Sequence, residues 1–105
     1  SALKSILKDR LSQDRVFQLA EGFDYPKTKE AVGILEKLSK KINYKIKSML
    51  VVYTGEEKDK LRGFVNTEAG MINARNLKIF KLAQAENLIL TPEAKAFLEN
   101  RLNEK

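Results

Sequence analysis

The sequence predicts a mainly α-helical fold: a single compact domain over residues 1–105, with four to six helices in a bundle or an orthogonal array. Two observations favour this class. Apolar residues recur every three or four positions along most of the chain, and helix-capping residues separate these stretches. With 43% hydrophobic residues, only two prolines and five glycines, and no repeat or long linker, the chain has the means to bury one core.

Two short helices are expected before residue 23. The spacing of apolar residues predicts the first over residues 3–11 and the second over residues 14–22, where Gly22 ends the pattern. The step from Tyr25 to Pro26 then indicates a connector, because a residue before proline avoids the α region. A third helix is therefore expected to begin at residues 26–28.

Residues 28–53 fit two templates. At about 100° per residue, the spaced apolar residues from Ala31 to Tyr53 fall within an arc of about 120°. This pattern predicts one long amphipathic helix of about 39 Å, at 1.5 Å per residue. However, residues 42–47 alternate between apolar and polar as a half-buried strand does. The alternative is therefore an α+β fold with a strand over residues 42–53.

Two further helices are expected in the middle of the chain. Acidic residues precede basic ones over residues 56–65, which suits the helix dipole, and Leu61, Phe64 and Val65 would form the buried side. Asn and Thr at 66 and 67 can cap another helix, which the apolar spacing extends through residues 66–83.

The last helix has the clearest local signal. Thr91 is a good N-cap, Pro92 suits the first helical turn, and Glu93 follows at the positive end of the dipole. The apolar residues after them lie three or four positions apart, so the helix is expected to run almost to the end of the sequence.

The composition argues against an enzyme. The chain has no histidine and no cysteine, so it lacks the usual general base, the usual strong nucleophile and the commonest metal ligands. The glycines at 55, 63 and 70 do not have the spacing of a phosphate-binding loop. We therefore expect no catalytic residues, no metal site and no cofactor.

The sequence also predicts an intracellular, cytoplasmic location. Without cysteine, nothing indicates an oxidising compartment. The longest apolar run, residues 49–53, is far shorter than the roughly 20 residues that cross a bilayer, and the first residues do not form a signal-peptide core.

Positive charge is concentrated in the first half of the chain. Of the formal net charge of +6, residues 1–52 contribute 11 basic and 6 acidic side chains. No Asp or Glu occurs between Glu36 and Glu56, while five lysines fall within residues 37–47. Cations without acidic neighbours suit a partner that carries phosphates or carboxylates.

We therefore expect a non-catalytic protein that binds nucleic acid, DNA or RNA, or another polyanion through a lysine-rich helix face. An aromatic ring on that face can stack on a base, and a second set of cations follows later in the chain. The predicted nucleic-acid-binding residues are Lys37, Lys40, Lys41, Tyr44, Lys45, Lys47, Arg75 and Lys78.

The alternative is a protein-interaction module, such as a helical adaptor, an immunity protein or a small subunit of an assembly. Val51 and Val52 fall outside the main apolar arc of the predicted long helix. Apolar residues on the wrong face indicate a further contact, which could be a protein partner or a second copy of the chain.

Overall fold

The computed structural model describes residues 5, 8–9, 15–77 and 79–102, and its centre is a four-stranded sheet. The strand order is β1-β4-β2-β3, and every pair of neighbouring strands is parallel. The prediction of a mainly α-helical bundle is therefore wrong, because the chain has an α/β fold. The strands are β1 (Val16–Gln18), β2 (Met49–Tyr53), β3 (Gly70–Asn73) and β4 (Asn87–Leu90).

The two central strands, β2 and β4, are buried along almost their whole length. Every residue of β4 is buried, as are the first four residues of β2. Their register pairs Val51 with Ile89 and Val52 with Leu90. A parallel strand that is covered on both faces needs apolar side chains at every position, so its sequence is a continuous apolar run instead of an alternating one.

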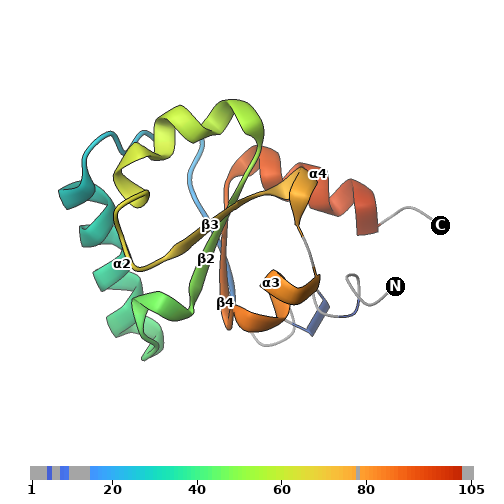
Figure 1. The fold of residues 1–105 in the computed structure, drawn as a ribbon, viewed down its shortest axis with the longest axis horizontal. Helices are drawn as coiled ribbons and strands as arrows, with labels where there is room; N and C mark the ends of the chain where they lie inside the picture. The colour runs from blue at the N-terminus through green and yellow to red at the C-terminus, as the bar shows by residue number, and fades with distance from the viewer. Residues whose placement is uncertain (1–4, 6–7, 10–14, 78, 103–105) are drawn as a thin grey trace.

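Helices cover both faces of the sheet, and each face has its own core (Figure 1). On one face, Ala31 and Leu35 of α2 pack with residues of β2 and η2. On the other, Ala94 and Leu98 of α4 pack with Leu82 of α3. The helices are α2 (Thr28–Ile42), η1 (Ile46–Ser48), η2 (Gly55–Phe64), η3 (Ala74–Asn76), α3 (Ile79–Gln84) and α4 (Pro92–Leu102), of which the η elements are 3₁₀ helices.

The long helix predicted over residues 28–53 is three elements. Its helical part, α2, ends at Ile42, and Asn43 after it is left-handed, with φ of 59° and ψ of 45°. The short helix η1 follows, and the chain then enters β2. The apolar arc was misleading because residues 49–53 are apolar at every position and so fit a helix face by default. The alternative strand over residues 42–53 is present only at Met49–Tyr53, within a parallel sheet.

Two other predicted helices also contain strands. Residues 16–18 of the second predicted helix form β1, and residues 66–83 contain β3, η3 and the start of α3. Both strands are short edge strands, and their few residues fit a helical spacing as well as an extended one. The first predicted helix lies largely outside the described residues.

Helices whose start is marked by proline or by a capping residue agree better with the prediction. The helix α2 begins at Thr28, and α4 begins at Pro92, where the Ala94 N–H donates to Thr91 Oγ1 at 3.1 Å. A helix occurs at residues 55–64 as expected, although it is a 3₁₀ helix. Leu61 and Phe64 are buried there, whereas Val65 is 59% exposed.

Candidate nucleic-acid interface

Several cations lie near the amino ends of the strands. Arg15 directly precedes β1, and Lys45 and Lys47 belong to the connection that leads into β2. The helix α2 runs toward the same end, because its last residue, Ile42, is followed by this connection. The topology therefore gathers basic side chains that are distant in the sequence.

Tyr44 joins these segments. The Arg15 guanidinium lies over the Tyr44 ring, 4.7 Å from its centroid, so the start of β1 contacts the end of α2. The backbone around the ring is held as well, because the Tyr44 N–H donates to the Ser39 carbonyl at 3.3 Å and the Ser39 hydroxyl donates to the Tyr44 carbonyl. The half-buried ring is therefore fixed between Arg15 and α2. The sequence had placed it on a continuous helix face, and the left-handed turn at Asn43 removes that face.

The five predicted lysines of residues 37–47 are all exposed. Ion pairs found among the described residues join Arg62 to Asp59 and Lys95 to Glu99, and neither involves one of these lysines. One acidic side chain, Glu86, belongs to the same end of the sheet, since its N–H donates to the Ser48 carbonyl at 3.0 Å. Lys40 and Lys41 lie in the last turn of α2, where positive charge also stabilises the helix dipole by about 0.3–1 kcal/mol.

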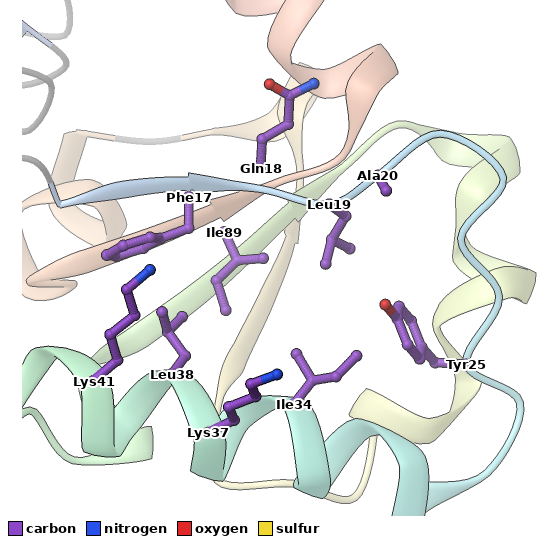
Figure 2. A pocket seen from close by; sticks show the side chains of 10 residues that line it. All are labelled: Phe17, Gln18, Leu19, Ala20, Tyr25, Ile34, Lys37, Leu38, Lys41 and Ile89. Carbon is purple, nitrogen blue, oxygen red and sulfur yellow. The ribbon is translucent and has the colours of Figure 1, made fainter.

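Lys37 and Lys41 lie beside an apolar groove between α2 and the sheet (Figure 2). Side chains descend from β1 and β4 and rise from α2 into one space of about 410 Å³, with Tyr25 at one end. The groove is lined by Phe17, Gln18, Leu19, Ala20, Tyr25, Ile34, Lys37, Leu38, Lys41 and Ile89.

Arg75 does not join the lysines. It lies in η3, where its guanidinium is 5.7 Å from the centroid of the Phe97 ring of α4. Lys78, the other cation predicted with it, lies outside the described residues. Arg75 therefore belongs to the α4 face of the sheet, opposite the face that α2 covers.

Val51 and Val52 have no exposed surface. They lie in β2, one pointing into each core. The apolar strip that motivated the protein-interaction alternative is therefore the inside of the sheet. Both residues fall outside the apolar face that a helix would have, and a strand buried on both faces explains them better.

A polar cluster at the carboxyl ends of β2 and β4 uses its groups internally. The buried Glu57 carboxylate accepts hydrogen bonds from the Thr54 N–H at 2.9 Å, from the Thr54 hydroxyl at 3.0 Å and from the Thr91 hydroxyl. The single proton of the Thr54 hydroxyl is shared with Glu93, whose Oε2 lies 2.7 Å from Thr54 Oγ1. These bonds tie η2 and α4 to the ends of the two central strands.

Sequence reasoning missed Arg15, Phe17 and Tyr25. Arg15 and Phe17 were assigned to a helix and Tyr25 to a connector, so none was related to the lysines. Recognising residues 49–53 and 87–90 as buried parallel strands would have indicated the sheet, because such runs are typical of strands covered on both faces.

The described residues contain no group of three or more Asp or Glu side chains placed to hold a metal ion, and none of their helices is long and apolar enough to cross a membrane. A comparison with protein families matches residues 1–101 to the model of the "Ribosomal protein L4/L1 family". Such a family is not one of enzymes, and its ribosomal proteins belong to an assembly of RNA and protein. The match extends over nearly all of the 105 residues, and the chain belongs to the ribosomal protein L4/L1 family.

Proposed function

We propose that the chain is a non-catalytic component of the ribosome that binds ribosomal RNA through one basic surface. Two observations support the proposal. The chain belongs to a ribosomal family, and basic side chains from separate segments lie near the same end of the sheet, where Arg15 contacts Tyr44. A ribosomal role also agrees with the intracellular location expected from a chain without cysteine. The basic surface consists of Arg15, Lys37, Lys40, Lys41, Lys45 and Lys47, together with Tyr44.

Such a surface suits the phosphates of folded RNA. Lysine is a compact point charge, and its contacts with phosphates position a protein without reading sequence. Each contact releases counterions, so the affinity falls as salt rises. The absence of an ion pair between these lysines and the described carboxylates leaves their charge available to such a partner.

Salt-dependent binding tests the proposal. We expect a labelled ribosomal RNA transcript to bind the full chain, with an affinity that falls steeply between about 50 and 200 mM salt in fluorescence anisotropy. The double substitution Lys41→Glu and Lys45→Glu should weaken binding at least about tenfold and reduce the salt slope by about one per lysine that contacts a phosphate.

A charge-matched control separates the surface from the net charge. Lys29→Glu with Lys58→Glu makes the same change in net charge at exposed positions of α2 and η2 outside the basic surface. This control should retain most of the affinity. Equal losses in the two variants would show that only the overall charge matters, and no salt-sensitive binding by the unchanged protein would exclude the proposed RNA binding.

The apolar strip that supported the protein-interaction alternative, Val51 and Val52, is buried inside the chain. One form of that alternative, a small subunit of an assembly, agrees with membership of a ribosomal family. DNA is a weaker candidate than RNA, because the family is defined by ribosomal proteins.

A further inference from the structure

We propose that the groove between β1 and α2 binds one unstacked nucleotide of the RNA, with its base in the groove and its phosphates at Lys37 and Lys41. This proposal rests on the proposed RNA binding and assigns a specific task to one part of the basic surface. It is argued from the walls of the groove, the edge of the sheet and the position of the two lysines.

The walls of the groove suit an aromatic ring. Phe17 of β1 and Leu19, the residue after this strand, point into the groove from the sheet (Figure 2). Ile34 and Leu38 point into it from α2. Its volume of about 410 Å³ is within the range of small-molecule sites, about 300–1,000 Å³. Proteins bind extruded RNA bases by stacking them on aromatic and apolar side chains.

Tyr25 forms a rigid end of the groove. Its ring stacks on Phe23 with 6.3 Å between centroids and meets the Phe64 ring edge-on at 5.5 Å. The backbone of Tyr25 is held on both sides, because its N–H donates to the Lys60 carbonyl at 2.8 Å and its carbonyl accepts from the Gly63 N–H at 2.7 Å. The hydroxyl points into the groove (Figure 2).

The edge of the sheet offers hydrogen-bonding groups. Among the described strands, β1 is an outermost one, with β4 on its inner side. The Leu19 N–H donates inward to the Leu90 carbonyl at 2.9 Å. Because backbone groups of alternate residues along a parallel strand face opposite edges, those of Val16 and Gln18 face outward. A base in the groove can therefore use its polar edge against the backbone while its faces contact apolar side chains.

The two lysines define where the phosphates lie. Both rise from α2 beside the groove, and among the described residues no carboxylate lines it. Along the chain, Glu21 and Asp24 are in the connection that carries Tyr25, and Glu36 directly precedes Lys37 in α2. Because Lys37 and Lys41 are one helical turn apart, they place the sugar–phosphate backbone along α2.

The groove has the features of a base site instead of a simple phosphate site. A phosphate alone would need the lysines and no apolar cavity. An extended peptide could also contact the outer edge of β1, but only an acidic peptide would use the two cations beside the apolar pocket. An acidic peptide that binds at this edge is therefore an outcome that the test must distinguish.

The test compares three RNA hairpins by fluorescence anisotropy with the full chain: a continuous duplex, the same duplex with a single-nucleotide bulge, and that bulge made abasic. We expect the bulged hairpin to bind about tenfold more tightly than the other two. The abasic hairpin keeps the phosphate and lacks the base, so this comparison isolates the groove from the charge. In ¹H–¹⁵N spectra, the amides of Val16 and Gln18 should shift with the bulged hairpin only.

Variants that fill the groove provide the second half of the test. Ile34 is half-buried, lines the groove and is not part of either buried core, so Ile34→Trp should fill the space without disturbing the cores. We expect it to abolish the tenfold preference for the bulge and to leave duplex affinity unchanged. Ile34→Val is the control that keeps the groove open, and it should retain the preference. Ala20→Trp fills the groove from the sheet side, at an exposed position, if Ile34→Trp fails to fold.

The outcomes separate this inference from the proposed function. If the unchanged protein bound none of the three hairpins, the proposed RNA binding itself would be wrong. Binding to duplex RNA without a preference for the bulge, or an intact preference in both groove-filling variants, would overturn the base site alone. Displacement of the bulged hairpin by an acidic peptide that shifts the same amides more strongly than the hairpin does would assign the groove to a peptide.

Discussion

Asn43 decides how the chain leaves α2. Its backbone is left-handed, with φ of 59° and ψ of 45°, and its N–H donates to the Ser39 carbonyl. Among residues other than glycine, asparagine adopts this conformation comparatively easily, and it is common just after helices. The turn sends Tyr44 toward Arg15 and allows the chain to enter β2 instead of extending the helix.

Substitutions at Asn43 should therefore separate backbone conformation from side-chain contacts. Asn43→Ala should lower the free energy of unfolding by about 1 kcal/mol, because a Cβ without a local polar group disfavours the left-handed region. Asn43→Gly should cost less, since glycine has no such penalty. Urea denaturation measures both values. If the alanine variant were as stable as the glycine variant, the left-handed conformation would not be what the position requires.

At the scale of elements, the sequence predicted those that carry local signals. The Thr91–Pro92 cap defines the start of α4, and the Pro26 step with the apolar spacing defines the start of α2. The strands were missed for a physical reason. A strand buried on both faces has no polar alternation, and a short edge strand such as β1, of three residues, is too brief to show a period.

The sequence alone indicates which basic residues form the candidate site, but it does not indicate how they lie relative to the groove. The run of lysines without acidic residues is visible in the sequence, and their positions as RNA contacts stay a prediction. The groove depends on pairing between β1 and β4, whose registered residues Phe17 and Ile89 are distant in sequence. No local pattern reports such a contact, so Phe17 and Tyr25 could not be related to Lys37.

Gly63 shows how tightly η2 packs against the start of α2. A Cβ at this position would lie 2.2 Å from the Lys27 carbonyl oxygen and 2.9 Å from the Tyr25 carbonyl oxygen. Gly63→Ala should therefore destabilise the protein by about 1–3 kcal/mol. Gly33→Ala is the opposite case, since nothing lies within 4 Å of a Cβ in the interior of α2, and it should stabilise by about 0.5–1 kcal/mol. Thermal unfolding measures the stability of the two variants. A Gly63→Ala protein as stable as the parent would contradict the close approach of Gly63 to the Lys27 and Tyr25 carbonyl groups.

At the scale of the whole molecule, the sheet separates two cores. Leu35 of α2 packs in one, while Leu98 of α4 and Leu88 of β4 pack in the other. An all-parallel sheet requires both faces to be covered, so neither layer of helices is dispensable. Helices α2 and α4 lie on opposite faces of the sheet (Figure 1). The groove lies on the α2 side, where Lys37 and Lys41 of the basic surface line it.

This separation predicts how substitutions in the cores combine. Leu35→Val and Leu98→Val should each lower the free energy of unfolding by about 1–2 kcal/mol, because each removes a buried methylene and leaves a cavity. Their costs should add to within about 0.5 kcal/mol in the double variant, since they share no packing partners. Leu88→Val with Leu98→Val is the matched pair within one core, and its cost should depart from the sum. Urea denaturation measures each value. Strong coupling between Leu35 and Leu98 would mean that the sheet transmits packing changes from one face to the other, and variants on the α4 face would then also alter RNA binding at the groove.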